Sequence, residues 1–379
     1  MKVAINTRLL IAGAPLEGVA RYTWEVARRL VALHPDWQFY FFFDRSYDSQ
    51  FVPGPNVTPV VLHPPARHPL LFVIWFECAV VRALHRYRID VFYSPDIFTS
   101  LRAPCKTLLT VHDLAFAHYP GHVSTVMRLY FEHFMPRMLR RTDRILAVSR
   151  FTLRDIEAQY PDIDTPMAVA YNDCRPAFRP QTTAVIEATR EQYASGQAYW
   201  LYVGSLHPRK NVARLIQAYD RYRSRPNALP YPLLLVGRMA WKTDDVQRAY
   251  EQATHKSDIV LTGVISDQEL PRIVGAAYAM VYVSLFEGFG LPVLEAMRSG
   301  IPVITTAGSS MAEVAQGSAI LTDATDVEAI ADSMSLLADD LELYQRCAVD
   351  GRAAATRFSW SSTTKIVSEH IAALYGEVL

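Results

Sequence analysis

The chain has 379 residues, enough for two domains of ordinary size. Half of the residues are hydrophobic, a fifth are charged and the formal net charge is zero, so the composition is that of a globular protein without a basic surface for nucleic acid. Four scattered cysteines do not indicate a disulfide framework or a zinc site and favour a reducing cytosol. The N-terminal residues lack the apolar core of a signal peptide, and we therefore expect a cytoplasmic protein.

The first half of the chain alternates short apolar runs with stretches of helical periodicity, the pattern of an α/β fold. The predicted strands are residues 1–6, 38–43, 91–93, 107–111, 144–149 and 168–170, and the predicted helices are residues 17–33, 126–141 and a segment that starts near Ser149. Gly18 lies at the start of the first helix, where backbone N–H groups can meet a phosphate. An ordinary glycine at a helix start is the alternative interpretation.

Residues 70–84 form a long apolar segment. The segment is shorter than the roughly 20 residues that cross a bilayer, and Glu77 and Arg82 interrupt it. We therefore expect a core helix. The alternative is an apolar face that rests on a membrane surface.

His112 and Asp113 directly follow the predicted strand 107–111. In an open parallel sheet, the residues just past the carboxyl end of a strand border the ligand crevice, so this pair is a candidate for the site. Taken alone, a single histidine is more often structural. The spacing of His118 and His122, further along the same loop, does not indicate a metal site, and we interpret them as loop or substrate-side residues.

Residues 173–187 contain two prolines and two threonines without a clear period, and we interpret them as the linker between two domains. The alternation of strands and helices then resumes. The predicted strands are residues 200–204, 232–237, 259–261, 280–283 and 302–305, and the predicted helices are a segment from Val212 and residues 267–276, 291–299 and 361–375. Both halves of the chain therefore indicate a doubly wound α/β domain.

A glycine-rich turn within residues 284–300 joins a buried strand to a helix. Gly288 and Gly290 permit a tight turn, and the N-terminus of the following helix faces it. Backbone N–H groups and the helix dipole together favour a bound anion there. Two carboxylates frame the turn: Glu287 lies in it, and Glu295 follows two helical turns later. The alternative interpretation is an ordinary strand–helix turn with two solvated glutamates.

Arg209 and Lys210 also lie between a predicted strand and a predicted helix. Cations at a helix N-terminus oppose the helix dipole, so a bound anion explains them better than a solvated helix start does. An Asp-x-Asp sequence at residues 162–164 could attract a divalent cation, but it lies between two prolines in the first half of the chain. We expect no metal ion at the anion site, because the two cations and a helix N-terminus already supply positive charge.

The run EGFGLPVLEAM at residues 287–297 resembles the signature of glycosyltransferase family 4, which comprises retaining nucleotide-sugar glycosyltransferases of the two-lobed GT-B fold. Residues 204–211 are similar to the G-x-x-x-x-x-K-N stretch of that family, and His112-Asp113 to its His-Asp pair. The resemblance is strong for residues 200–324 and weaker for the first half. The chain departs from the family pattern at Ala20, where a second glycine is usual, and at Met311 and Ala312, where Leu-Pro is common.

The resemblance implies an α/β protein of GT-B architecture with two doubly wound, Rossmann-like lobes. The acceptor-side lobe is expected at residues 1–176 and the donor lobe at residues 177–360. Residues 361–379 are expected to form a terminal helix that packs back on the first lobe.

The resemblance also implies a role for each candidate residue. Glu287 and His112 are the catalytic candidates, both in contact with the donor sugar. The residues implied to bind the donor diphosphate are Arg209, Lys210, Gly18, Gly290 and Leu291. Gly288 and Phe289 are implied to contact the donor sugar, and Glu295 the ribose. No residue is implied to bind a metal ion.

The implied reaction moves a hexose, for which we expect mannose, from a nucleotide diphosphate sugar to a saccharide or lipid-linked acceptor in surface polysaccharide synthesis. We expect no cofactor and no nucleic acid, and a peripheral membrane contact through the first lobe. A GT-B epimerase or hydrolase of the donor and a non-catalytic two-lobed sugar-binding protein remain as alternatives. A dehydrogenase is disfavoured because residues 1–18 lack the glycine fingerprint.

Overall fold

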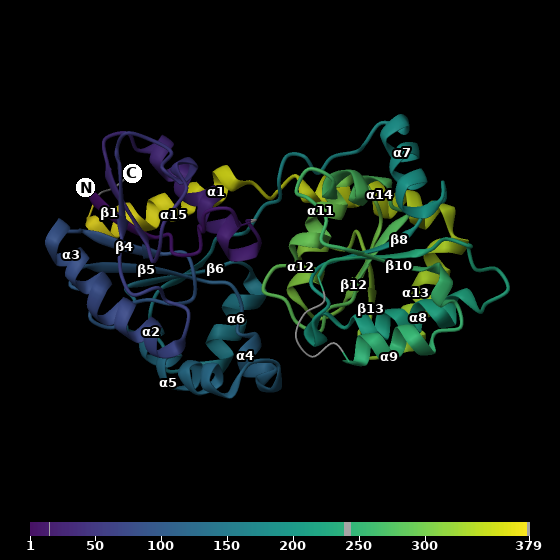
Figure 1. The fold of residues 1–379 in the computed structure, drawn as a ribbon, viewed down its shortest axis with the longest axis horizontal. Helices are drawn as coiled ribbons and strands as arrows, with labels where there is room; N and C mark the ends of the chain where they lie inside the picture. The colour runs from purple at the N-terminus through teal and green to yellow at the C-terminus, as the bar shows by residue number, and fades with distance from the viewer. Residues whose placement is uncertain (15, 239–243, 377–379) are drawn as a thin grey trace. The chain divides into compact units, whose positions relative to one another are not determined.

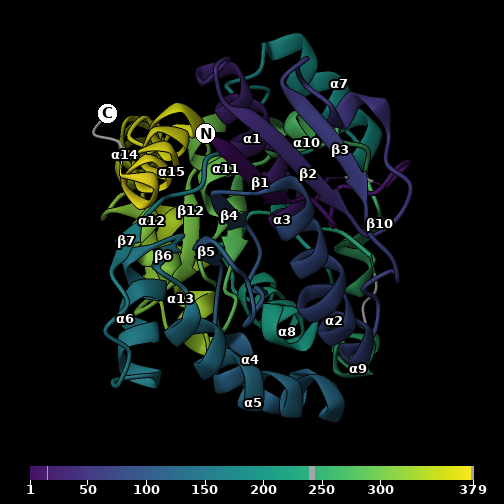
Figure 2. The same cartoon turned by 90° about the vertical axis from the view of Figure 1, so that its left-hand side faces the viewer.

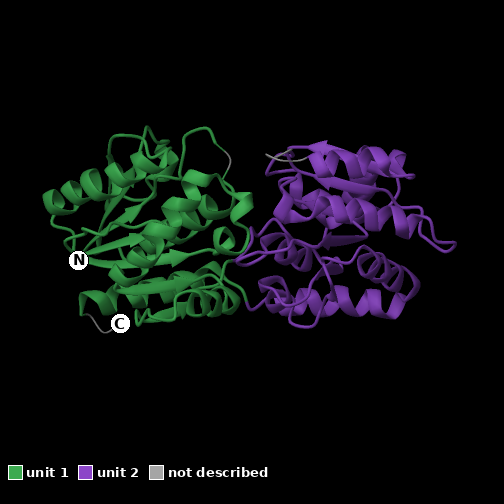
Figure 3. Ribbon diagram, turned by 90° about the horizontal axis from the view of Figure 1, so that it is seen from below, with its two compact units in different colours: residues 1–172, 358–379 green, residues 173–357 purple. Residues whose placement is uncertain are grey.

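The computed structural model describes residues 1–14, 16–238 and 244–376, and the chain divides into two compact units (Figure 3). Unit 1 consists of residues 1–172 and 358–379, and unit 2 consists of residues 173–357. Both termini belong to unit 1, because the chain returns to it after unit 2 is complete. The predicted terminal segment 361–379 includes residues 377–379, which lie outside the described residues.

Unit 1 is built on a parallel sheet whose seven described strands run in the order β3-β2-β1-β4-β5-β6-β7 (Figure 2). The strands are β1 Lys2–Asn6, β2 Gln38–Phe43, β3 Val57–Val61, β4 Val91–Ser94, β5 Lys106–Val111, β6 Arg144–Ala147 and β7 Met167–Val169. β1 and β4 are paired although β2 and β3 lie between them in sequence, so the winding reverses at this point. Ligands of such sheets bind at the carboxyl ends of the strands near this reversal.

Helices cover both faces of the sheet in unit 1 (Figure 1). They are α1 Gly18–Leu33, α2 Pro69–Ile74, α3 Val81–Tyr87, α4 Ala115–His118, α5 Thr125–Arg141, α6 Arg150–Gln159 and α15 Trp360–Tyr375. α1 and α15 pack against each other on one face, and α2, α3 and α5 cover the other. Large buried side chains such as Trp75, Phe92 and Met135 fill the space between that second layer and the sheet.

The apolar segment 70–84 is helical, as predicted. α2 continues through a π-helical stretch, Trp75–Val80, into α3 without a break. Trp75 and Phe76 are buried in the core of unit 1, whereas Leu70 and Ile74 are exposed. The segment therefore forms part of the core along one side and leaves apolar side chains at the surface along the other.

Unit 2 has the same winding in a parallel sheet of order β10-β9-β8-β11-β12-β13. The strands are β8 Trp200–Val203, β9 Leu233–Val236, β10 Ile259–Gly263, β11 Ala279–Tyr282, β12 Val303–Thr306 and β13 Ile320–Thr322. β8, β9 and β11 are fully buried, which explains their nearly continuous apolar sequences. β8 and β11 are the paired strands at which the winding reverses.

The helices of unit 2 also form two layers. They are α7 Thr183–Ala194, α8 Val212–Arg223, α9 Asp244–Gln252, α10 Leu270–Ala276, α11 Leu291–Ser299, α12 Ser310–Ala315, α13 Val327–Asp339 and α14 Leu341–Ala355. α7, α11 and α14 lie on one face of the sheet, and α8, α9 and α13 lie on the other (Figure 1).

The linker predicted at residues 173–187 extends too far, because α7 begins at Thr183. Its sequence gives only a weak helical period, and contacts distant in sequence hold the helix in place. α7 packs against α10, and the Arg190 side chain donates a hydrogen bond to the Ala276 carbonyl oxygen at 2.9 Å. Tertiary packing therefore decides the structure of a segment whose composition resembles a linker.

The terminal helix α15 packs against α1, β4 and β5 of unit 1, so the expected return to the first lobe is confirmed. Val367 and Ile371 are fully buried at this contact, and His34 and Ser368 form a hydrogen bond of 2.6 Å across it. Two doubly wound α/β units and this returning helix confirm the fold class predicted from the sequence.

Candidate active site

The strongest candidate site in unit 2 lies past the carboxyl ends of β8 and β11, where the winding of the sheet reverses. Two loops meet there, residues 204–211 after β8 and residues 283–290 after β11. The backbone N–H of Leu285 donates to the carbonyl oxygen of Arg209 at 2.9 Å, and the Ser284 hydroxyl donates to the same oxygen at 3.1 Å. The topology thus brings the two sequence motifs of the second half together.

Arg209 and Lys210 lie in a short 3₁₀ segment, Pro208–Lys210, that precedes α8. Asn211 follows with a left-handed φ of 62° and is buried. Its side-chain amide donates to the carbonyl oxygens of Val283 at 3.0 Å and Ala324 at 2.6 Å. These bonds fix the basic turn against the end of β11.

Glu287 is the centre of a cluster of charges. One of its carboxylate oxygens, Oε1, accepts a hydrogen bond from Lys210 Nζ at 2.5 Å, and the other, Oε2, lies 3.3 Å from a guanidinium nitrogen of Arg209. Arg209 also donates to the Phe286 carbonyl oxygen. The side chain of Glu287 is buried and has lost most of its hydration, and the two cations offset the free-energy cost of that loss.

The charges around Glu287 determine its protonation. Burial by itself raises the pKa of this carboxyl group, but Lys210 and Arg209 outweigh burial and hold the pKa at about 2. Glu287 is therefore a carboxylate at neutral pH. A carboxylate in a buried site can accept hydrogen bonds from hydroxyl groups or stabilise a nearby positive charge.

The turn after Glu287 has the geometry that the glycine pattern predicts. Gly290 has a φ of 97°, which glycine adopts without strain, and α11 starts at Leu291 as predicted. A Cβ atom at Gly290 would lie 2.7 Å from Cγ of Met311, so the position also has no room for a side chain. The start of this nine-residue helix consequently lies directly beside the charge cluster.

The other predicted residues of unit 2 lie on the same loop and helix. Gly288 and Phe289 are buried between Glu287 and the start of α11. Glu295 lies in the second turn of α11 and is partly buried. The spacing of the two glutamates thus corresponds to one residue in the loop and one inside the helix, as the sequence pattern predicts.

Two predicted residues, His112 and Gly18, belong to unit 1. His112 follows β5, and its Nε2 lies 2.7 Å from the carbonyl oxygen of Pro95, which requires a proton on that nitrogen. Burial lowers the pKa of His112 and favours the neutral ring. Gly18 begins α1 with a φ of 46°, and outside its own helix and chain neighbours no described heavy atom lies within 4 Å of a Cβ built there.

Three residues of the unit 2 site were not among the sequence candidates. Tyr282, at the end of β11, bonds to both Lys210 and Glu287. Asn211 anchors the basic turn, and the Ser310 hydroxyl donates to the backbone carbonyl oxygen of Glu287 at 2.6 Å. Asn211 could have been found from the sequence, because it is the asparagine of the K-N pair in the G-x-x-x-x-x-K-N stretch. Tyr282 is indistinguishable in sequence from a core aromatic, and Ser310 had no signal.

Within the described part of the chain, no three His, Cys, Asp or Glu side chains are grouped so that they could hold a metal ion. His118 pairs instead with Asp155 at 2.7 Å. The two aspartates of the predicted Asp-x-Asp turn, Asp162 and Asp164, are exposed in unit 1. None of the helices that the structure describes is long and apolar enough to span a bilayer.

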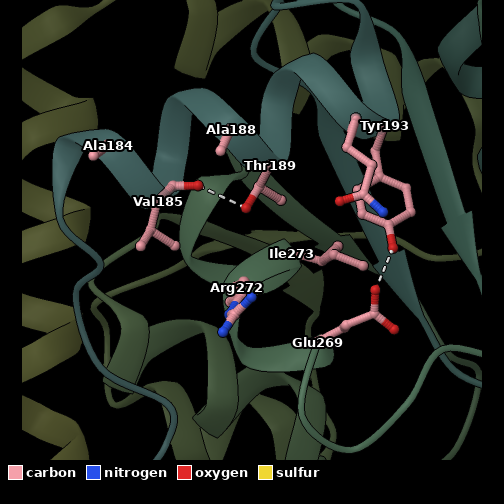
Figure 4. A pocket seen from close by; sticks show the side chains of 9 residues that line it. Ala184, Val185, Ala188, Thr189, Tyr193, Glu269, Arg272 and Ile273 are labelled. Atoms are coloured by element: carbon pink, nitrogen blue, oxygen red, sulfur yellow. Dashed lines mark hydrogen bonds between the residues drawn. The ribbon is translucent and has the colours of Figure 1, made fainter.

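A cavity of about 220 Å³ in unit 2 lies between α7 and α10 (Figure 4). Three of its polar side chains are hydrogen-bonded within the protein: the Tyr193 hydroxyl donates to Glu269 at 3.1 Å, and the Thr189 hydroxyl donates to the Val185 carbonyl oxygen at 2.7 Å. No candidate residue from the sequence lines this cavity. The cluster around Glu287 therefore remains the better candidate for chemistry.

Two family models match the chain, one in its first half and one in its second half. Residues 16–172 match Glycosyltransferase Family 4, and residues 185–354 match Glycosyl transferases group 1. The chain belongs to glycosyltransferase family 4. It is thus a retaining, nucleotide-sugar-dependent glycosyltransferase of the GT-B fold, and members of this family bind a nucleotide-sugar donor and an acceptor.

Individual relatives agree with this assignment. O-antigen chain mannosyltransferase B of Escherichia coli is 28% identical over 361 residues, which cover 92% of this chain and 94% of the relative. Sucrose-phosphate synthase of Thermosynechococcus elongatus superposes with a TM-score of 0.79 at 17% identity, over 99% of both chains. WaaG, a glycosyltransferase involved in lipopolysaccharide biosynthesis, gives 0.77 at 17% identity, over 97% of this chain and 99% of its own. At these identities the two structures support the fold alone.

Proposed function

We propose that this family 4 enzyme transfers mannose from a nucleotide diphosphate donor to a saccharide or lipid-linked acceptor in surface polysaccharide synthesis. The observation that carries the site assignment is the buried cluster of Glu287, Arg209 and Lys210 beside the start of α11. The choice of mannose and of a polysaccharide rests on the similarity to an O-antigen mannosyltransferase over nearly the whole chain.

In this proposal, the donor diphosphate binds where positive charge already converges. Arg209 and Lys210 pair with its oxygens, and the backbone amides at Gly290 and Leu291 contribute through the start of α11. As the diphosphate departs, negative charge grows on these oxygens, and the cations stabilise it where it forms. Gly18, at the start of α1 in unit 1, is assigned to the diphosphate by the family resemblance, because backbone N–H groups at a helix start can bind a phosphate.

The donor sugar and ribose are assigned to carboxylates and to His112. The transition state of glycosyl transfer carries positive charge on the sugar ring, and the Glu287 carboxylate stabilises that charge and accepts hydrogen bonds from sugar hydroxyls. Gly288 and Phe289 border the sugar on the same loop. His112, which belongs to unit 1, is assigned to the sugar by the family resemblance alone. Glu295 accepts hydrogen bonds from the two ribose hydroxyls.

The acceptor is assigned to unit 1, and a lipid-linked acceptor would bring this unit to a membrane surface on the cytoplasmic side. α2 and α5 pack against each other and expose Leu70, Ile74, Val126 and Leu129. Such side chains favour contact with the interface of a bilayer. Flotation with anionic lipid vesicles tests this part of the proposal, and binding that is unchanged in a Leu129→Glu variant would contradict it.

The function itself is tested with a panel of nucleotide diphosphate sugars and a saccharide acceptor, with detection of a glycosidic product. We expect a mannosyl donor to give product and Glu287→Gln to lower the rate about 100-fold or more. The variant should still bind the free nucleoside diphosphate, because it loses a competitor for Arg209 and Lys210 rather than a ligand. Glu328→Gln, at an exposed glutamate of α13, is the matched control.

Two outcomes would contradict the proposal. Near-normal transfer by folded Glu287→Gln would remove Glu287 from the site. Hydrolysis or epimerisation of the donor without a glycosidic product, for every acceptor tried, would favour an enzyme that acts on the donor alone.

A further inference from the structure

We propose that Tyr282 is a positioning residue that holds the Glu287 carboxylate in its reactive orientation while Arg209 and Lys210 turn to the donor diphosphate. This inference rests on the proposed roles of those three residues. Tyr282 itself would touch neither the diphosphate nor the sugar, and it would act on the reaction through Glu287.

The tyrosine forms a closed triangle with an acid and a base. Lys210 Nζ lies 2.8 Å from the Tyr282 hydroxyl oxygen, and that oxygen lies 3.1 Å from Glu287 Oε1. The third side of the triangle is the 2.5 Å contact between Lys210 Nζ and Glu287 Oε1. All three groups come from different segments: the basic turn, the end of β11 and the loop before α11.

The chemistry of the groups fixes the direction of each bond. An ammonium group has only donors, so Lys210 donates to the Tyr282 oxygen. The hydroxyl hydrogen of Tyr282 is then directed to Glu287, whose carboxylate can only accept. Burial, reinforced by the negative charge of Glu287, raises the pKa of Tyr282 well above its ordinary value, so the hydroxyl keeps this proton at neutral pH.

Three of the groups that donate to Glu287, namely Tyr282, Arg209 and Lys210, differ in how firmly they are held. Tyr282 is fully buried, and its ring stacks on that of Tyr202 with centroids 5.7 Å apart. Arg209 and Lys210 reach the carboxylate through long side chains with many rotamers. The tyrosine hydroxyl is therefore the rigid partner of Glu287, and the two cations are the movable ones.

This difference matters once a donor binds. A diphosphate competes with Glu287 for Arg209 and Lys210, and the buried carboxylate then loses part of its compensation. The Tyr282 hydroxyl has its hydrogen committed to Glu287, so it stays with the carboxylate. The Tyr282 hydroxyl thereby keeps the Glu287 carboxylate ionised and correctly oriented during the reaction.

The direct test is Tyr282→Phe, which removes the hydroxyl and keeps the ring. We expect kcat to fall about 10- to 100-fold, as for the loss of a hydrogen bond to a charged group. The KM for the donor and the calorimetric Kd for the free nucleoside diphosphate should change less than about threefold, since the phosphate contacts remain. Retained nucleotide affinity also shows that the site is folded.

Tyr219→Phe is the matched control. Tyr219 is a fully buried tyrosine of the same unit, and its hydroxyl donates to the Tyr231 carbonyl oxygen at 2.9 Å, a bond that does not involve the site. Its variant should keep the wild-type kcat. If both variants lose kcat equally, the loss comes from general destabilisation and the inference is wrong.

A double-mutant cycle shows whether Tyr282 acts through Glu287. In a Glu287→Gln background, Tyr282→Phe should lower kcat by less than about twofold, because the group that it positions has already been replaced. An equal loss in both backgrounds, or wild-type kcat for Tyr282→Phe alone, would overturn this inference and leave the role of Glu287 intact. Near-normal activity of Glu287→Gln would instead overturn the proposed function and this inference with it.

Discussion

Glu287 combines three features: its side chain is buried, two cations lie beside it, and it is next to the start of a helix. Without Arg209 and Lys210, a buried carboxylate would be protonated or would destabilise the fold. The same cations are the groups that a diphosphate attracts most strongly. The protein therefore balances its cations and its buried carboxylate by pairing them with each other.

The two cations give a prediction for binding. Arg209→Ala and Lys210→Ala should each weaken binding of a free nucleoside diphosphate about 10- to 150-fold, the value of a charge-assisted hydrogen bond to an anion. Isothermal titration calorimetry measures this directly. Arg221→Ala, an exposed cation of α8, is the control. Unchanged affinity in both site variants would place the diphosphate elsewhere.

The depressed pKa of Glu287 gives a prediction for stability. Its pKa is about 2 in the folded protein and near 4.5 in an exposed chain, so the carboxylate contributes stability above about pH 4.5 and loses it as the pH falls toward 2. The contribution is at most about 3 kcal/mol. Urea midpoints of wild type and Glu287→Gln should therefore converge between pH 6 and pH 3. A difference that stays constant over this range would contradict the linkage.

The charges of the site also lead us to predict transfer without a divalent metal. Arg209, Lys210 and the start of α11 supply the positive charge that Mg²⁺ or Mn²⁺ would otherwise bring to a diphosphate. Turnover should survive EDTA, and the paired change Asp162→Ala with Asp164→Ala should leave it unaltered. Activity that stops with EDTA and returns with Mn²⁺ would show that the cations alone do not suffice.

At the scale of elements, the candidate site is built from β11, the loop after it and α11. Gly290 combines a left-handed φ of 97° with contact to Met311. Gly290→Ala should therefore cost about 1–2 kcal/mol in backbone strain and a further 1–3 kcal/mol in overpacking. Gly317→Ala is the control, because Gly317 has a φ of 80° but, its chain neighbours apart, no described heavy atom within 4 Å of its Cβ position. Urea unfolding should show a larger loss of unfolding free energy for Gly290→Ala than for Gly317→Ala. Equal losses would show that overpacking against Met311 contributes nothing.

Elements of both units were predictable where local signals and burial agree. α11 begins at Leu291 and ends before Gly300 as predicted, and Ser149 caps α6 by accepting from the Thr152 amide at 2.9 Å. The sequence pattern places residues 183–187, the start of α7, in the linker, because the helical state of α7 depends on packing against α10. The pairing of Glu287 with Lys210 joins residues 77 positions apart, which a single sequence does not reveal.

At the scale of the whole molecule, the chain builds unit 2 as an insertion into unit 1. It leaves unit 1 after residue 172 and returns at residue 358 to add α15. The stability of unit 1 therefore depends on α15, while Arg209, Lys210 and Glu287 of the candidate diphosphate site lie in the inserted unit. The two properties should respond separately to mutation.

Ile371→Ala tests this separation. Ile371 is fully buried where α15 packs on unit 1, so the truncation should destabilise that unit by about 2–5 kcal/mol. The nucleoside diphosphate affinity of the folded variant should stay within about twofold of wild type, because Arg209, Lys210 and Glu287 belong to unit 2. Urea unfolding with limited proteolysis measures the first effect, and calorimetry measures the second. Tyr375→Ala, an exposed position one helical turn later, should alter neither property. A loss of nucleotide affinity without a loss of stability would mean that α15 acts on the donor site and not only on the core of unit 1.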